Sequence, residues 1–250
     1  MSTILILHGW GSCAKNWSQV KELLEGGGYK VFVPDLPGFG ETPEPLQPWS
    51  VDDYVEWVND FCEKENLLQF FLLGHSFGGG IAAKLASSFS EKVLGLILVS
   101  PAIRRRRTLK QYIFLGLAKM GNLVFTIPIL FFLRPLARKI LYIFAGTKDY
   151  YKLEIRKAVR LKESFKKIVK EDLTYCLPKI KIPTLIIWGE KDVVTPVKEA
   201  YSIKNKIKNA KIEIIKDSQH GLNLEKPDIL AEKIIQFLEI QSLENRSREY

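Results

Sequence analysis

Cysteine is scarce in this sequence: Cys13, Cys62 and Cys176 are the only three among 250 residues, and none is spaced as a metal ligand. An odd number of scattered thiols excludes a disulfide framework and favours free, buried side chains in a reducing compartment. The chain also begins Met-Ser-Thr and turns apolar at Ile4, without the basic stretch or cleavage site of a secretory leader. We therefore expect a cytoplasmic protein.

An uninterrupted apolar run of membrane-spanning length is missing as well. The most apolar stretch, residues 113–133, has 15 apolar residues of 21, but Lys119, Asn122 and Pro128 interrupt it. Such interruptions disfavour a spanning helix. There is no internal repeat, and the length suits one large globular domain with or without an insertion.

Short apolar runs of strand length recur along the chain with helical stretches between them. They are nearly continuous in Val, Ile, Leu and Phe, which is typical of parallel strands buried on both faces. The alternation predicts a doubly wound, mostly parallel α/β sheet of about six strands with helices on both faces. The expected strands are residues 4–7, 30–33, 70–73, 94–99, 184–188 and 211–215, and the expected helices lie near 14–25, 50–65, 77–89, 162–176, 196–207 and 227–240.

The alternation fails between residues 101 and 161, which predicts a helical cap inserted into a core made of residues 1–100 and 162–250. Acidic residues are nearly absent there: residues 101–170 hold 18 of the 37 Lys and Arg but only 3 of the 28 Asp and Glu. Two interpretations of this charge stay open. The cap packs an apolar face on the core and leaves its charged face in water, or the charge attracts an anionic lipid surface or substrate. No nucleic-acid-binding motif accompanies it, so no such partner is expected.

Gly74-His-Ser-Phe-Gly78 is the most informative motif. An apolar run of strand character precedes it, and small apolar residues at helical spacing follow. A serine at a sharp strand-to-helix turn is exposed as a nucleophile, and flanking glycines allow the strained backbone that such a turn needs. We therefore expect Ser76 to be a nucleophile, the alternative being an ordinary glycine-rich turn.

Histidine is scarce too, which narrows the choice of base for Ser76 to His8, His75 or His220. His75 adjoins the serine and is expected to point away from it. His220 follows the last expected strand, in a loop at the same edge of the sheet, and is the candidate base. The orienting acid is expected after the strand 184–188, where Asp192 is preferred and Glu190 is the alternative.

Negative charge that develops on a substrate carbonyl needs preorganised N–H donors. The backbone N–H of Phe77, directly after the nucleophile, is one candidate. The turn His8-Gly-Trp-Gly11 supplies the other, with the Trp10 N–H as the expected donor. Strand-to-loop punctuation is the alternative interpretation of that turn.

Taken together, five motifs resemble the α/β-hydrolase superfamily, and the resemblance covers essentially the whole chain outside the expected cap. It implies the roles given above, with no metal and no organic cofactor. In one respect the sequence departs from the pattern: many members have two further strands before the His-Gly turn, so the sheet is expected to be shorter at that edge. The motifs are His8-Gly-Trp-Gly11, Asp35-Leu-Pro-Gly-Phe-Gly40, Gly74-His-Ser-Phe-Gly-Gly79, Ile186-Ile-Trp-Gly-Glu-Lys-Asp192 and Gln219-His-Gly221.

The resemblance also narrows the chemistry. Dehalogenases and epoxide hydrolases of this fold have Asp where this chain has Ser76, and carbon–carbon bond hydrolases often have Trp where Gly221 follows the histidine. A serine esterase or lipase that works through an acyl-enzyme, with an acyl or other apolar ester bound under the cap, is therefore expected. A thioesterase, a carbon–carbon bond hydrolase and a ligand-sensing protein with little turnover are the alternatives.

Overall fold

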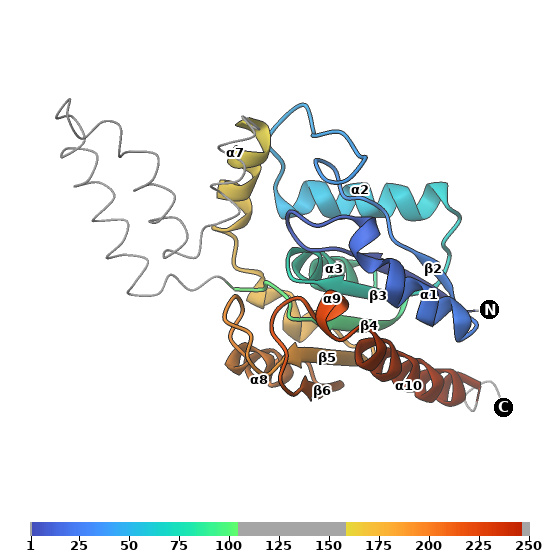
Figure 1. Ribbon diagram of the computed structural model, residues 1–250. Coiled ribbons are helices and arrows are strands. Elements are labelled where there is room, and N and C mark those ends of the chain that lie inside the picture. Colours follow the sequence, from blue (N-terminus) through green and yellow to red (C-terminus); the bar gives the residue numbers. More distant parts are fainter. Residues whose placement is uncertain (1, 105–158, 247–250) are drawn as a thin grey trace, which may run out of the picture.

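The structure, a computed structural model, describes residues 2–104 and 159–246 (Figure 1). The strands are β1 (Thr3–Leu7), β2 (Lys30–Phe32), β3 (Phe70–His75), β4 (Val93–Val99), β5 (Thr184–Gly189) and β6 (Ala210–Ile215). The α-helices are α1 (Ser18–Gly26), α2 (Val51–Lys64), α3 (Phe77–Ser88), α7 (Val159–Ile168), α8 (Lys198–Lys204), α9 (Leu222–Glu225) and α10 (Pro227–Arg246). Short 3₁₀ helices are η1 (Ala14–Trp17), η3 (Leu173–Tyr175) and η4 (Leu177–Lys179).

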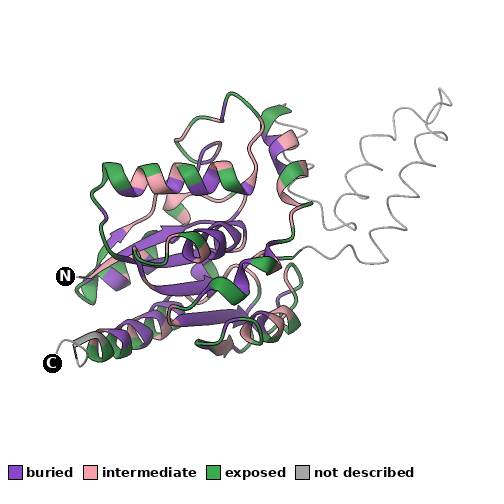
Figure 2. Ribbon diagram, turned by 180° about the vertical axis from the view of Figure 1, so that it is seen from behind, coloured by how far each residue is buried: buried purple, intermediate pink, exposed green. Residues whose placement is uncertain are grey.

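The strands form one six-stranded sheet in the order β2-β1-β3-β4-β5-β6, and every neighbouring pair is parallel. All six expected strands are present, which confirms the α/β fold class. In the central strands every residue of the expected apolar runs except half-buried Leu94 is buried, because helices cover both faces of the sheet (Figure 2). β2 is one edge strand and β6 is the other.

Alternate residues of each strand enter two separate cores, as the two-residue period of a strand requires. Leu5 and Leu72 face the core beneath α2, α3 and α8, whereas Ile4 and Phe71 face the core beneath α1 and α10. α7 lies beside the N-terminal end of α2 (Figure 1), and the Trp49 N–H donates to Ser164 Oγ at 2.8 Å.

The helix expected near residues 162–176 is wrong in its extent. α7 ends at Ile168, and the backbone N–H of Leu173 donates to the Ile103 carbonyl at 3.1 Å instead of to a helical partner. The Asp172 carboxylate then accepts from the Thr174 N–H and starts η3. The hydrogen bond between Leu173 and Ile103 joins the segment before residues 105–158 to the segment after them.

Most of the expected cap lies outside the described residues, so its boundaries at 101 and 161 stay a prediction. The apolar stretch 113–133 lies wholly outside the described residues. Within the described ranges, no helix combines the length and the hydropathy that crossing a bilayer demands.

Candidate active site

The sheet order places a switch point between β1 and β3, and we call the space at the carboxyl ends of these two strands the crevice. From β1 the chain continues through α1 to β2 on one side, whereas β3 lies on the other side of β1 and leads into α3 on the opposite face. At such a switch point the loops after the two strands diverge and leave room for a ligand. The His8–Gly11 turn follows β1, and Ser76 follows β3.

Ser76 occupies a strained turn between β3 and α3. Its φ of 52° and ψ of −115° lie in a region that residues with a side chain rarely adopt. A Cβ atom at Gly78 would overlap the carbonyl oxygen of Leu7, so only glycine allows α3 to approach β1 this closely. The strand, sharp turn and helix expected around Ser76 are present.

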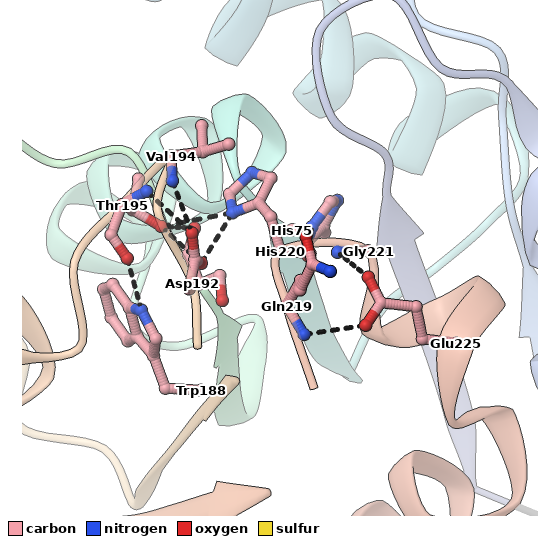
Figure 3. A network of polar contacts seen from close by, with 10 residues as sticks. His75, Trp188, Asp192, Val194, Thr195, Gln219, His220, Gly221 and Glu225 are labelled. Atoms are coloured by element: carbon pink, nitrogen blue, oxygen red, sulfur yellow. Dashed lines mark hydrogen bonds and ion pairs between the residues drawn. The ribbon is translucent and has the colours of Figure 1, made fainter. Parts of the chain in front are cut away.

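His220 and Asp192 meet at the same edge of the sheet, from the loops after β6 and β5. His220 Nδ1 lies 2.7 Å from Asp192 Oδ2, and the Asp192 side chain is 0% exposed while that of His220 is 19% exposed (Figure 3). The other expected acid, Glu190, instead accepts a hydrogen bond from the Asp217 N–H at 3.1 Å. The structure therefore brings Asp192, rather than Glu190, to the histidine.

The Asp192 carboxylate is held in its ionised form. Oδ1 accepts hydrogen bonds from the backbone N–H groups of Val194 and Thr195, at 2.8 and 2.9 Å. Burial by itself raises the pKa of Asp192, but the bonds and charge of His220 and the bonds from Thr195 outweigh burial and leave the pKa below its ordinary value. An ionised carboxylate at Nδ1 keeps the proton on that nitrogen and leaves Nε2 free to act as a base.

His75 connects the serine turn to the histidine loop. Its Nε2–H donates to the backbone carbonyl of His220 at 2.9 Å, and the two imidazole rings lie 4.9 Å apart. Burial, helped by the charge of His220, lowers the pKa of His75 to about 3, so the ring is neutral at ordinary pH. Ser76 is half-buried, and its hydroxyl forms no hydrogen bond with any other residue that the structure describes.

The two expected oxyanion donors lie on either side of the crevice. Within the described residues, neither the Trp10 nor the Phe77 backbone N–H is taken by an acceptor. The Trp10 and Phe77 rings make an edge contact at 5.2 Å between centroids. A Cβ atom at Gly9 would lie 3.3 Å from the Cβ of Ser76, so the turn after β1 approaches the serine closely. Both N–H groups are therefore free for a ligand next to Ser76.

Buried side chains of the His8–Gly11 and Asp35–Gly40 motifs hold the turn after β1 in place. Buried His8 accepts from the Leu36 N–H at Nε2 (2.9 Å), which leaves Nδ1–H to donate to the Gly9 carbonyl (2.8 Å). Burial lowers the pKa of His8, in agreement with this neutral tautomer. Asp35 accepts from the Ala14 N–H at 2.6 Å and so fastens the loop after β2 to η1. These residues position the backbone of the crevice and lie outside the candidate triad.

An apolar pocket adjoins the crevice. Trp10 and Phe77 form part of its wall together with residues of α7 and of the segments that flank residues 105–158, among them Ile103, Phe165 and Leu173. Among the described residues of the wall, Glu171 is the one with a charged side chain, and its carboxylate pairs with Lys84 of α3 at 2.5 Å. An apolar chain of a substrate fits this lining better than a charged group does.

Two residues that sequence reasoning missed hold the candidate base in place. Glu225 of α9 accepts from the N–H of Gln219 and from that of Gly221, at 2.7 and 3.2 Å, and so fixes the backbone on both sides of His220 (Figure 3). The Thr195 hydroxyl contacts both Asp192 and His220. A glutamate in a short helix and a threonine before proline are both common, so neither carries a signal of its own in the sequence. In the part of the chain described, no three His, Cys, Asp or Glu side chains gather as metal ligands.

Comparisons with known proteins bear on the family and the fold of this chain. The model of the alpha/beta hydrolase fold family matches residues 2–120 and 133–227. The human monoacylglycerol lipase ABHD6 is 30% identical over 253 residues, which are 94% of this chain and 75% of that protein. A membrane phospholipase A described as a bacterial virulence factor is 25% identical with a TM-score of 0.73, covering 96% of this chain and 79% of its own. An esterase from Exiguobacterium antarcticum shares the fold, at 22% identity and a TM-score of 0.74, over 96% and 92% of the two chains.

Proposed function

The chain belongs to the alpha/beta hydrolase fold family, and from that premise we propose that it is a serine hydrolase that cleaves carboxylic esters through an acyl-enzyme. The observation that carries the proposal is the buried Asp192–His220 pair, joined through His75 to the strained turn of Ser76. A carboxylate that orients an imidazole, and an imidazole that takes the proton of a hydroxyl, together form a serine nucleophile activated by a base. The matching relatives are lipase-like and esterase-like hydrolases, which supports ester hydrolysis as the reaction.

In the proposed mechanism Ser76 Oγ attacks the ester carbonyl carbon while His220 Nε2 takes the hydroxyl proton. Asp192 stabilises the imidazolium through Nδ1–H, and the N–H groups of Trp10 and Phe77 bind the oxyanion. Collapse of the tetrahedral intermediate breaks the carbon–oxygen bond, and the proton on His220 leaves with the alcohol. Water, activated by His220, then hydrolyses the acyl-enzyme and returns the proton to Ser76.

The substrates that fit best are esters with an apolar acyl group, because the pocket beside Trp10 and Phe77 is apolar apart from Glu171. The monoacylglycerol lipases among the relatives support lipid esters as the class to test first. We assign residues 101–161 to a cap at this pocket. Ile103 precedes residues 105–158 and Leu173 follows them, both line the pocket, and the Leu173 N–H donates to the Ile103 carbonyl.

The test is hydrolysis of p-nitrophenyl esters of increasing acyl length and of monoacylglycerols, with Ser76→Ala beside the wild type. We expect the substitution to lower kcat/KM by at least about 10³-fold. Ser87→Ala is a matched control on the same helix, because the Ser87 hydroxyl donates to the Lys84 carbonyl, away from the crevice. Unchanged turnover in Ser76→Ala would overturn the assignment.

The same samples separate the alternatives. Faster turnover of acyl thioesters than of oxygen esters indicates a thioesterase, and turnover of a vinylogous diketone indicates a carbon–carbon bond hydrolase. Binding of an ester without turnover indicates a ligand-sensing protein.

A further inference from the structure

The hydroxyl of Thr195 lies at the junction of the two titratable partners of the candidate triad. Thr195 Oγ1 is 2.9 Å from Asp192 Oδ2 and 3.2 Å from His220 Nδ1, while these two atoms are 2.7 Å apart (Figure 3). The three atoms therefore form a closed triangle. Among the described residues, no other side-chain hydroxyl forms a hydrogen bond with the Asp192 carboxylate or with the His220 ring.

The direction of each hydrogen bond in the triangle follows from the protons available. An ionised carboxylate can only accept, so the Thr195 O–H donates to Asp192 Oδ2. A lone pair of Thr195 Oγ1 then faces the Nδ1–H of His220, which donates mainly to Asp192. The hydroxyl has one competing acceptor, the Ser100 carbonyl, but that distance is 3.3 Å and the bond is the weaker one.

The main chain fixes Thr195 in this position from both sides. Its N–H donates to Asp192 Oδ1 at 2.9 Å, and its carbonyl accepts from the indole N–H of buried Trp188 at 2.7 Å. Pro196 follows and disfavours helical backbone at Thr195. The hydroxyl is therefore held at the Asp192–His220 contact before any substrate arrives, as preorganised electrostatics requires.

From this geometry we infer that Thr195 is a positioning residue for the base: its hydroxyl orients the Asp192 carboxylate and keeps the proton of His220 on Nδ1. The inference rests on the proposed function, because it assigns Thr195 to the same reaction. Thr195 touches no reacting atom and acts only through Asp192 and His220. A purely structural role in the turn 190–196 would instead need only its backbone, which every substitution leaves in place.

Thr195→Val tests the inference, because valine has the shape of threonine without the hydroxyl. We expect kcat/KM for the best ester to fall about tenfold, chiefly through kcat, as for the loss of one hydrogen bond to a charged group. Thr195→Ser, which keeps the hydroxyl, is expected to stay within about twofold of the wild type, and Thr195→Ala is expected to behave like Thr195→Val. Thr184→Val is the matched control, since the hydroxyl of this buried threonine at the start of β5 donates to the Ile182 carbonyl, far from His220 at the other end of the strand.

Two further measurements distinguish positioning from structure. The ¹⁵N NMR signals of the imidazole rings report the tautomer, and we expect the Nδ1–H fraction of His220 to fall in Thr195→Val and Thr195→Ala but not in Thr195→Ser. With three histidines in the chain, His75→Gln identifies one of the signals by its disappearance. In an Asp192→Asn background, Thr195→Val should cause no further loss, because the path through the carboxylate is already broken.

Wild-type kcat/KM and an unchanged His220 tautomer in Thr195→Val would overturn the inference, as would an undiminished loss in the Asp192→Asn background. Absent ester turnover in the wild type, or full activity in Ser76→Ala, would instead overturn the proposed function. In that case the NMR spectra of the folded variants still decide whether Thr195 sets the tautomer.

Discussion

The buried imidazole of His75 should make folding sensitive to acid, and His75→Gln should remove that sensitivity. Burial lowers the pKa of His75 to about 3 in the folded chain, whereas an unfolded histidine titrates near its ordinary value of 6.5. Glutamine is the matched replacement, since its amide nitrogen can donate to the His220 carbonyl as His75 Nε2–H does and it does not titrate.

The sign follows from which state binds the proton. Between pH 6.5 and 3 the unfolded chain is protonated at His75 and the folded chain is not, so stability falls as the pH falls through this window. Each pH unit within it costs about 1.4 kcal/mol, and the step from about pH 7.5 to about pH 4.5 costs about 2.7 kcal/mol. Above about pH 7.5 the side chain contributes almost no pH dependence.

Urea unfolding followed by tryptophan fluorescence at these two pH values measures the effect. The free energy of unfolding of His75→Gln should fall between them by about 2.7 kcal/mol less than that of the wild type. The carboxyl pKa of Asp192 is lowered from 3.8, so this group stays ionised at pH 4.5 in both proteins. Ser76→Ala, one residue away and without a titratable group, is the control and should keep the wild-type pH dependence. Equal losses in wild type and His75→Gln would refute the reasoning.

Three further perturbations test other parts of the structure. Lys84→Met should destabilise the protein by about 2 kcal/mol in urea unfolding, because the lysine side chain is only 9% exposed. Asp52→Asn should cost less than about 0.5 kcal/mol, because the Asp52 side chain, the partner of Lys84 in this ion pair, is 67% exposed. Equal costs for the two variants would contradict this. Gly9→Ala should lower kcat at least about tenfold with a smaller effect on KM, because its Cβ would lie 3.0 Å from His75 Nδ1 and 3.3 Å from the Cβ of Ser76 and would displace the serine turn. Unchanged kinetics would count against a crevice at this turn. Sedimentation with anionic liposomes should pellet the protein at low salt and release it at high salt if the basic segment 101–170 attracts lipid; no pelleting at low salt would exclude that interpretation.

The sheet could be predicted from the sequence because its strands are buried on both faces. Such strands require apolar residues at every position, as in residues 70–73, and this makes each run visible without any tertiary information. The end of α7 could not be predicted in the same way. It is set by the hydrogen bond from the Leu173 N–H to the Ile103 carbonyl, between residues 70 positions apart, and by a carboxylate that caps η3.

In the candidate site, too, residues with a local sequence motif could be predicted and residues that matter through tertiary contacts could not. The placement of Ser76, Asp192 and His220 at one edge of the sheet could be predicted, because each follows a strand in a motif of its own and parallel strands bring their carboxyl ends together. Thr195 and Glu225 could not be predicted, because their importance lies in how the loops after β5 and β6 contact one another. These loop contacts form only in the folded sheet, and neither threonine nor glutamate is rare at turns.

The strain at Ser76 explains why so much of the hydrogen bonding near the crevice converges on one residue. A non-glycine backbone at φ 52° costs on the order of 1–3 kcal/mol. The Ser76 N–H donates to the Val99 carbonyl, and its own carbonyl accepts from Gly79, Gly80 and Ala102 at 2.8 to 3.2 Å. At about 1 kcal/mol for each bond, these four contacts together match or exceed the strain. Because two of the partners, Val99 and Ala102, belong to β4 and the segment after it, the turn is held by the neighbouring strand, so its geometry survives exchange of the serine side chain. Ser76→Ala therefore removes the hydroxyl while the turn stays intact, which is what makes it a clean test of the nucleophile.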